Sequence, residues 1–504
     1  MARLHEYQGK ALLARHGFVV PRGAPASSAQ EAADVARGLG GAVVVKIQAW
    51  TTGRAELGGI AFAQNPEEAA QVAGRLLALQ VGNFPVTQVL VEEQLRFVRE
   101  LFVSLSIDDR RRQPVVLLSL SGGSGVEKRA GEVHRLDCDV TSGIDRAQLQ
   151  AAVDSSDLDG DAREWIADAA RRVFDVARAI EARSIEINPL ALTDDGRMIA
   201  ADCRITVDDY AVFRHPELGI DIARELDHPP TQLERIAYGI EQQDHRGTFY
   251  FAQLATEPSP GSRGLVGFHG AGGGGSMMSM DAITNEGFTL ANFTDTSGNP
   301  SAAKVYRAAR VILAQPGLCG YFGSGSGVAS QEQFWSAYGL AKAFWELNLN
   351  IPAVIRLGGN SEERAIDVLT HGTRGLKTTV EGYGKDDPPA RIAARFAELV
   401  GSAKGARWTP CKPRRPTFVG SANCLQYAIN GGRLCIDSDA WGRVRGVAQS
   451  VAPGLLTEHD GKPIPAIQPD EFATKDSEMI ALEVECRRAG IEGVHVVLEI
   501  PGLD

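Results

Sequence analysis

The chain has 504 residues, of which 44% are hydrophobic and 23% charged, and these ordinary values exclude the disordered and fibrous classes. A prior of roughly 150 residues per domain indicates three or four domains. The formal charge of −11 gives no global attraction to nucleic acid or anionic membranes, and it favours small-molecule chemistry.

The cysteines and the N-terminus indicate a cellular compartment. Seven cysteines are scattered without a C-x-x-C pair, so neither a zinc site nor a disulfide framework is expected. The N-terminal residues lack an apolar signal-peptide core, and no run approaches the roughly 18 apolar residues of a membrane span. We therefore expect a cytoplasmic protein with reduced thiols.

The first segment alternates helix and strand patterns. Ser28 to Glu31 form a capping-box pattern that opens a helix ending at Gly40-Gly41, and the β-branched residues Val43 to Lys46 then indicate a strand. Asn65-Pro66 starts another helix, with proline in its first turn. Further strands are predicted at 88–92, 100–107, 115–119, 184–190 and 198–202, and a helix at 161–182. These elements predict one α+β unit over residues 1–240.

A repeating unit follows a linker-like stretch at 241–262. From Gly264 on, a strand, a glycine loop and a helix recur. The loops are Gly270–Gly275, Gly323–Gly327 and Gly358–Asn360. This alternation predicts a flavodoxin-like, doubly wound parallel sheet over 263–402, with a ligand crevice at the carboxyl ends of its strands.

The last part of the chain follows a basic, proline-containing stretch at 404–416. It has a helical pattern at 478–490 and a strand pattern at 494–500. We expect a small α+β domain over 417–504 and assign it no function. The fold class of the whole chain is therefore α/β.

Several residues of the first segment have the chemistry of a nucleotide site. Lys46 ends a strand, Gly53-Arg54 follows in a loop, and Glu92 and Glu100 lie at the ends of later strands. Such a site needs a cation for the phosphates, unobstructed backbone amides, and carboxylates for ribose or metal. The pattern alone favours the alternative that Lys46 is a surface lysine at a strand end.

Asn188 and Asp202 are candidate metal ligands. Mg²⁺ prefers oxygen ligands and often takes one or two from protein. On adjacent antiparallel strands the two side chains could point to one face. A hairpin with an Asn-Pro turn and a solvated aspartate is an equal alternative.

A series of motifs runs in order through residues 1 to about 400. It comprises Leu4-His-Glu-Tyr-Gln8 with Lys10, Val45-Lys46-Ile-Gln48, Gly53-Arg54, Gly58-Gly59, Val91-Glu92, Glu100-Leu-Phe, Ile185-Glu-Ile-Asn-Pro-Leu190, Asp202, Ala211-Val-Phe-Arg214, Gly270-Ala-Gly272 and Arg356-Leu-Gly-Gly-Asn360. The series resembles the β subunits of succinate–CoA ligase and their relatives, malate–CoA ligase and the ATP-grasp part of ATP-citrate lyase. This resemblance implies an ATP-grasp fold for the first domain.

The resemblance also implies a reaction and its residues. The nucleotide, ATP or GTP, would be bound by Lys46, Gly53, Arg54, Glu92 and Glu100. Lys46 and Arg54 would act in catalysis, and Asn188 with Asp202 would hold the Mg²⁺ that bridges the phosphates. The activity would be an ADP-forming acid–CoA ligase, which makes a carbon–sulfur bond. Because the phosphohistidine loop and the CoA-binding Rossmann domain of that family are not recognisable here, a CoA-binding α-like partner is implied.

The proposed acid site departs from the family pattern. His269 stands where the family has an asparagine before Gly-Ala-Gly, and we expect it to be a cation or hydrogen-bond donor for a carboxylate; a neutral histidine bonded to backbone is the alternative. The second acid loop lacks the arginine of succinate-specific members. Carried over position by position, the acid-binding residues are His269, Gly270, Gly327, Val328, Ser330 and Arg356. We therefore expect a carboxylic acid other than succinate.

Glu56 replaces a lysine of the family beside the nucleotide phosphates. Two like charges 4 Å apart cost about 1 to 4 kcal/mol, so either Glu56 points away or nucleotide affinity is reduced. Two other functions stay open. One is an ATP-grasp carboxylate–amine ligase whose C-terminal domain supplies the acceptor site, and the other is a non-catalytic subunit that senses nucleotide or acid.

Overall fold

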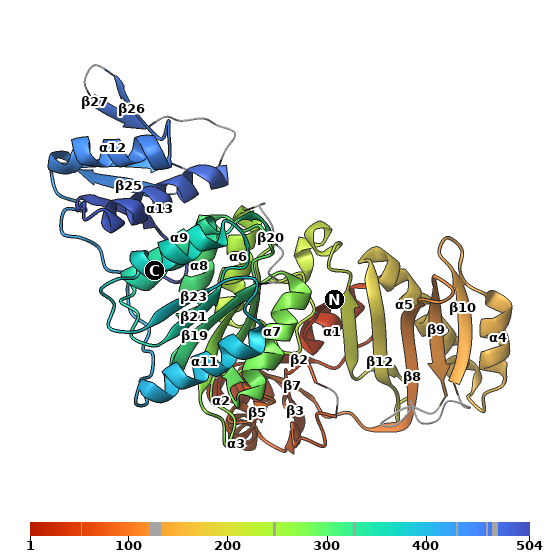
Figure 1. Cartoon of the computed structure of the whole chain (residues 1–504). Coiled ribbons are helices and arrows are strands. Elements are labelled where there is room, and N and C mark those ends of the chain that lie inside the picture. Colours follow the sequence, from red (N-terminus) through yellow and green to blue (C-terminus); the bar gives the residue numbers. More distant parts are fainter. Residues whose placement is uncertain are drawn as a thin grey trace. The chain divides into compact units, whose positions relative to one another are not determined.

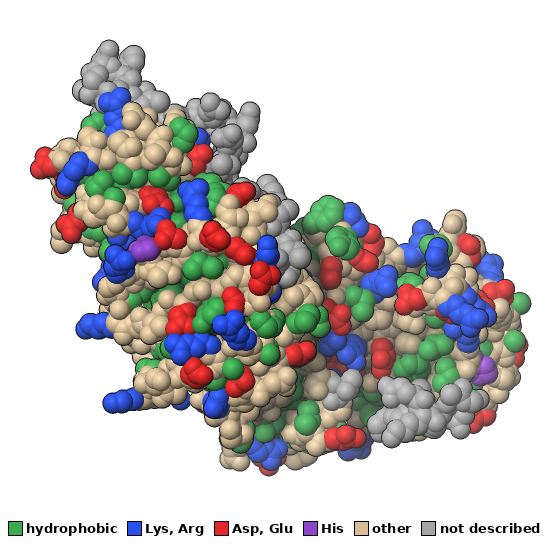
Figure 2. All heavy atoms as spheres, viewed as in Figure 1, with side chains coloured by type: hydrophobic (Ala, Val, Ile, Leu, Met, Phe, Trp, Pro, Cys, Tyr) green, Lys and Arg blue, Asp and Glu red, His purple; other side chains and the backbone are tan. Residues whose placement is uncertain are grey.

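The computed structural model divides into two compact units, Met1–Pro230 and Thr231–Asp504, which Figure 1 colours in chain order. The described residues are 1–51, 53–120, 133–244, 248–325, 329–429, 432–459, 462–465 and 472–504. Among these residues, no helix combines the length and the apolar character needed to cross a bilayer. On the face seen in Figure 2, acidic and basic side chains are interspersed.

The first unit contains a small antiparallel sheet of order β2-β7-β3-β4, packed against helices α2 and α3. Its elements are β2 (Gly23–Ala26), α2 (Ala29–Leu39), β3 (Val43–Ile47), β4 (Ile60–Ala63), α3 (Pro66–Leu77) and β7 (Val89–Glu93). The predicted helix ends are confirmed: Ser28 accepts from the N–H of Glu31, α2 ends at left-handed Gly40, and Asn65 caps α3. The predicted capping box is only half formed, because the Glu31 carboxylate accepts from the N–H of Ser27 and not from that of Ser28.

A larger antiparallel sheet forms the rest of the first unit, in the order β1-β14-β12-β8-β9-β10-β11, with β13 beside β12. Helix α5 packs on it, and α1 lies close to β14, because Gly9 has no side chain to meet Cys203. The elements are β1 (Ala2–Arg3), α1 (Glu6–Arg15), β8 (Phe97–Asp108), β9 (Gln113–Ser119), β10 (Val133–Asp139), β11 (Gly143–Ile144), α4 (Arg146–Asp154), α5 (Gly160–Ala179), β12 (Ala182–Thr193), β13 (Met198–Ala200) and β14 (Cys203–Val207). A short hairpin, β5 (Gln80–Val81) with β6 (Phe84–Pro85), lies outside both sheets.

The second unit has the predicted doubly wound sheet. Its parallel strands follow the order β18-β16-β19-β21-β23, and β15 pairs antiparallel at one edge. In chain order this is 2-1-3-4-5, the flavodoxin-like arrangement. The elements are β15 (Tyr250–Gln253), β16 (Leu265–Ala271), α7 (Gly273–Asn285), β17 (Thr289–Leu290), β18 (Asn292–Asp295), α8 (Ala302–Ile312), β19 (Leu318–Gly325), α9 (Phe334–Glu346), β21 (Ala353–Arg356), α10 (Glu362–Gly372), β23 (Val380–Tyr383) and α11 (Pro389–Ser402). Helices α7 and α11 pack together, as do α8, α9 and α10, and β20 (Ala329–Glu332) pairs with β22 (Gly359–Asn360).

Two boundaries differ from the sequence prediction. The first unit ends at Pro230, and the predicted linker 241–262 contains the end of α6 (Gln232–Gln243) and all of β15. The linker prediction was wrong because it rested on the prolines at 258 and 260. The apolar run at 249–252, which comes before them, enters the core of the second unit.

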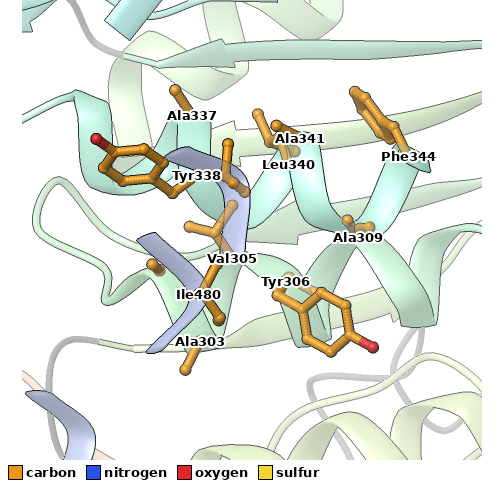
Figure 3. Close-up of a cluster of buried hydrophobic side chains, with 14 of the residues drawn as sticks. Ala303, Val305, Tyr306, Ala309, Ala337, Tyr338, Leu340, Ala341, Phe344 and Ile480 are labelled. Carbon is orange, nitrogen blue, oxygen red and sulfur yellow. The ribbon is translucent and has the colours of Figure 1, made fainter. Parts of the chain in front are cut away.

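The segment predicted as a separate C-terminal domain belongs to the second unit. Helix α13 (Phe472–Arg488) packs against α8 and α9, and Figure 3 shows Ile480 among Val305 and Tyr338 of those helices. Helix α13 also contacts β28, which belongs to a three-stranded antiparallel sheet of order β24-β25-β28. The remaining elements are β24 (Cys424–Ile429), β25 (Gly432–Asp437), α12 (Trp441–Val451), β26 (Leu456–His459), β27 (Lys462–Pro465) and β28 (Val494–Leu498). One hydrophobic core therefore runs through both parts.

Candidate functional site

Charged side chains from several segments of the first unit meet in one cluster. Lys46 lies near the end of β3, and Arg54 lies in the turn before β4. Glu92 comes from β7, Asp202 from the link between β13 and β14, and Glu6 from the start of α1. These five residues, together with Lys10, are called the Glu6 cluster below.

Glu6 is the centre of the cluster. One carboxylate oxygen is 2.9 Å from Lys46 Nζ and 2.8 Å from Lys10 Nζ, and the other is 2.7 Å from Arg54 Nη1. The other guanidinium nitrogen, Nη2, is 2.7 Å from Asp202 Oδ2. Glu92 accepts from Lys10 at 2.5 Å and from Lys46 at 2.9 Å. The carboxylate of Glu92 is thus directed to lysines inside the protein, so any nucleotide contact of this residue would have to come from its backbone.

Mutual attraction keeps the cluster ionised. Burial opposes the charge of Glu6, but Lys46, Lys10 and Arg54 hold the pKa of its carboxyl well below the usual range. Burial likewise opposes the charge of Lys46, and Glu6 and Glu92 nevertheless raise its pKa. For Asp202, burial and the nearby Glu6 charge raise the pKa above its ordinary value. Glu6 and Lys46 therefore carry full charges at neutral pH.

The predicted metal ligands are direct neighbours. The backbone N–H of Asn188 donates to the carbonyl of Asp202 at 3.2 Å, and the Asn188 amide nitrogen lies 3.4 Å from Glu186 Oε1. Asn188 does not form a turn: it lies inside β12, before a cis peptide to Pro189, where the pairing register shifts. At 28% exposure, Asp202 is the most accessible side chain of the Glu6 cluster. The backbones of Asn188 and Asp202 are therefore adjacent, and a carboxylate and an amide are ligand types that suit a hard divalent cation.

The other predicted nucleotide residues surround this cluster. Gly53 has φ of 67°, which favours glycine, and begins the turn that carries Arg54. Glu56 is exposed, and its carboxylate lies 3.3 Å from where a Gly53 Cβ would stand. Glu100 is half-buried on β8, opposite Ala191 of β12.

In the second unit, two of the predicted acid-binding residues, His269 and Gly270, lie where the strand order reverses. His269 and Gly270 end β16, next to Gly323 and Ser324 of β19. Gly270 has no room for a side chain, because a Cβ there would lie 2.8 Å from the Thr294 carbonyl. The carboxyl ends of β16 and β19 form the switch point of this topology, which is the usual ligand crevice.

His269 is buried and its ring is fully engaged. Nδ1 lies 2.6 Å from the Tyr321 hydroxyl and Nε2 lies 3.1 Å from Thr296 Oγ1. Burial lowers the pKa of His269 to about 4. The expected cationic role is therefore wrong at neutral pH. The alternative of a neutral histidine is supported, although its ring partners are two hydroxyl groups and not the backbone. Donation to an acid stays a prediction.

Replacing His269 with glutamine should remove a pH-dependent part of stability. Because the folded pKa is about 4 and the unfolded value is 6.5, the unfolded chain binds the proton more tightly, and stability falls as pH drops from 6.5 towards 4. From pH 7.5 to pH 5 this loss is about 2 kcal/mol in the wild type and absent from His269→Gln. Urea unfolding of both proteins at the two pH values measures it. An equal loss in both would contradict the neutral assignment.

Of the remaining residues predicted to bind the acid, the contacts of Arg356 are described. Arg356 donates to the carbonyls of Gly325 at 2.9 Å and of Lys385 at 2.6 Å, and burial lowers its pKa. Its guanidinium therefore joins the end of β19 to the segment that follows β23. Gly327 and Val328 lie outside the described residues, as does the side chain of Ser330.

Sequence reasoning gave no role to Glu6 and Lys10, or to Thr296 and Tyr321. The available signal for the first two was an i,i+4 Glu–Lys pair on one face of a short helix, beside buried Leu13. For Thr296 and Tyr321 there was no local signal, because each meets His269 through strand pairing.

The chain is similar to known proteins over most of its length. Residues 3–192 match the ATP-grasp domain family. The β subunit of ADP-forming succinate–CoA ligase from Rubrobacter xylanophilus is 31% identical over 374 residues, covering 73% of this chain and 92% of that protein. The GDP-forming β subunit from Thermus thermophilus is 32% identical over 371 residues, covering 73% and 93%. The solved structure of ATP citrate lyase from Methanothrix soehngenii, in complex with citrate and coenzyme A, is 20% identical, with a TM-score of 0.60 and coverage of 79% and 99%, and shares the fold.

Proposed function

Because the chain belongs to the family of succinate–CoA ligase β subunits, we propose that it is the nucleotide-binding subunit of an acid–CoA ligase. The reaction converts an acid, CoA and ATP or GTP into acyl-CoA, nucleoside diphosphate and phosphate. The phosphoryl group passes through a phosphohistidine on an α-like partner subunit, which also binds CoA.

The observation that carries this proposal is the Glu6 cluster. Lys46 and Arg54 are held as full charges by the same buried carboxylate, and so provide two fixed cations that could bind nucleotide phosphates. Asn188 and Asp202 would hold Mg²⁺, which when bound supplies positive charge to the phosphates. Glu92 and Lys10 keep the inner side of the cluster neutral.

The proposed acid site is the crevice at the carboxyl ends of β16 and β19. Helix α7 begins there after left-handed Gly272, and the free N–H groups of its first turn favour a carboxylate. Neutral His269, with the hydroxyl groups of Thr296 and Tyr321, supplies hydrogen bonds and no positive charge. The second acid loop lacks the arginine of succinate-specific members, and this difference supports an acid other than succinate.

The reaction is tested by co-purifying the chain with a CoA-binding α-like subunit and measuring nucleoside diphosphate release with a panel of small di- and tricarboxylates. We expect release with one member of the panel when CoA is also present, and background release when either is omitted. A folded complex that is silent with every acid would contradict the proposal.

A further inference from the structure

The outer edge of the Glu6 cluster is closed by an ion pair between a predicted phosphate ligand and a predicted metal ligand. Arg54 Nη2 and Asp202 Oδ2 are 2.7 Å apart, and their side chains are 13% and 28% exposed. Lys10 and Glu92, at the inner side, are 5% and 2% exposed. The pair is therefore the part of the cluster that solvent and ligands reach first.

The charges of the cluster cancel. Three cations, Lys10, Lys46 and Arg54, face three carboxylates, Glu6, Glu92 and Asp202. A phosphate that takes Arg54 without a cation leaves the Asp202 carboxylate beside a polyanion. A divalent cation that binds Asp202 when no phosphate is present would lie beside the Arg54 guanidinium, which is also positively charged. Either ligand alone thus replaces an attraction with a repulsion, whereas the two together give each residue a new partner of opposite charge.

Glu6 gives Arg54 a fixed point during such an exchange. Arg54 Nη1 donates to Glu6 at 2.7 Å and to the Ile47 carbonyl at 3.2 Å, so one edge of the guanidinium stays held when the other edge leaves Asp202. The planar fork of arginine allows the two edges to serve different partners.

We propose that the Arg54–Asp202 pair is exchanged for phosphate and divalent cation, so that the site accepts nucleotide and cation as a coupled pair, with Glu6 as the positioning residue. This inference rests on the proposed nucleotide-binding function. It predicts that Asp202 opposes metal-free nucleotide as well as supporting the metal-bound form.

The test is nucleotide binding by calorimetry, with ATP in EDTA and with ATP at saturating Mg²⁺. Wild type should bind metal-free ATP at least about tenfold more weakly than Mg-ATP. Asp202→Asn should bind metal-free ATP about tenfold more tightly than wild type does, and should gain less than about threefold from Mg²⁺. If Asp202→Asn does not fold, Asp202→Ser carries the same prediction.

Two matched variants separate the exchange from simpler effects. Asn188→Ala removes the other proposed metal ligand but no charge, so it should lose affinity for Mg-ATP without binding metal-free ATP more tightly than the wild type does. Glu186→Gln removes the charge of a carboxylate that accepts a hydrogen bond from the Asn188 side chain. Its affinity for metal-free ATP should rise less than about threefold above that of the wild type. The exchange would be contradicted if Asp202→Asn bound metal-free ATP no more tightly than the wild type does, or if Glu186→Gln raised that affinity as much as Asp202→Asn does. Either result would leave the proposed function standing. Wild-type chain that binds neither form would contradict the proposed function and the exchange with it.

Discussion

Replacing Lys342 with methionine is expected to lower the free energy of unfolding by about 3 to 5 kcal/mol. Lys342 is fully buried, and its ammonium lies 2.5 Å from Glu346, 2.6 Å from Glu483 and 2.7 Å from the Val496 carbonyl. Against the cost of burial, Lys342 and His495 hold the pKa of Glu483 well below its usual range. Removing the ammonium would leave two buried carboxylates without their main counter-charge.

Urea unfolding followed by tryptophan fluorescence measures this loss, because most of the tryptophans lie in the second unit. These are Trp335, Trp345, Trp408 and Trp441. Lys377→Met, at an exposed position of the same unit, is the matched control and should change stability by no more than about 0.5 kcal/mol. A loss below about 1 kcal/mol for Lys342→Met would contradict the view that the buried ion pairs of Lys342 stabilise the packing of the C-terminal segment on α9.

Replacing Lys46 with methionine is expected to weaken Mg-ATP binding at least about 100-fold. Charge-assisted hydrogen bonds to phosphate contribute about 1.5 to 3 kcal/mol each, and 100-fold corresponds to about 2.7 kcal/mol. The ammonium is already charged and held by Glu6, so Lys46 supplies a full positive charge to phosphate at neutral pH. Calorimetric titration with Mg-ATP gives the affinity directly.

Lys10→Met is the matched control for this prediction. Lys10 contacts the same three groups as Lys46, namely Glu6, Glu92 and the Ala201 carbonyl, at 2.8, 2.5 and 2.8 Å. Both variants therefore remove the same ionic contacts from the fold, while Lys46 alone is assigned to phosphate. We expect Lys10→Met to weaken binding less than about tenfold. Equal losses in the two variants would mean that the effect is structural.

Local chemistry explains which elements could be predicted. The caps at Ser28 and Asn65 and the glycine loops after β16 and β19 depend on residues a few positions apart, so their patterns are legible in the sequence. The strand order 2-1-3-4-5 also matched the predicted flavodoxin-like class, because alternating strands and helices constrain the sheet strongly.

Long-range packing explains what could not be predicted. Lys342 and Glu483 are 141 positions apart, and nothing near either residue indicates that a buried ion network joins the C-terminal segment to α9. In the same way, burial keeps His269 neutral, and the Thr296 and Tyr321 hydroxyls that contact its ring are 27 and 52 positions away in the chain. Charge, burial and partner are properties of the assembled fold, so the sequence located this residue without determining its protonation.

The most direct test of the phosphate site is a crystal structure of the chain with Mg²⁺ and a non-hydrolysable ATP analogue. We expect a metal about 2.1 Å from oxygens of Asn188 and Asp202, phosphates against Lys46 and Arg54, and Arg54 no longer paired with Asp202. A nucleotide bound elsewhere, with the Glu6 cluster unchanged and the Arg54–Asp202 pair intact, would contradict it.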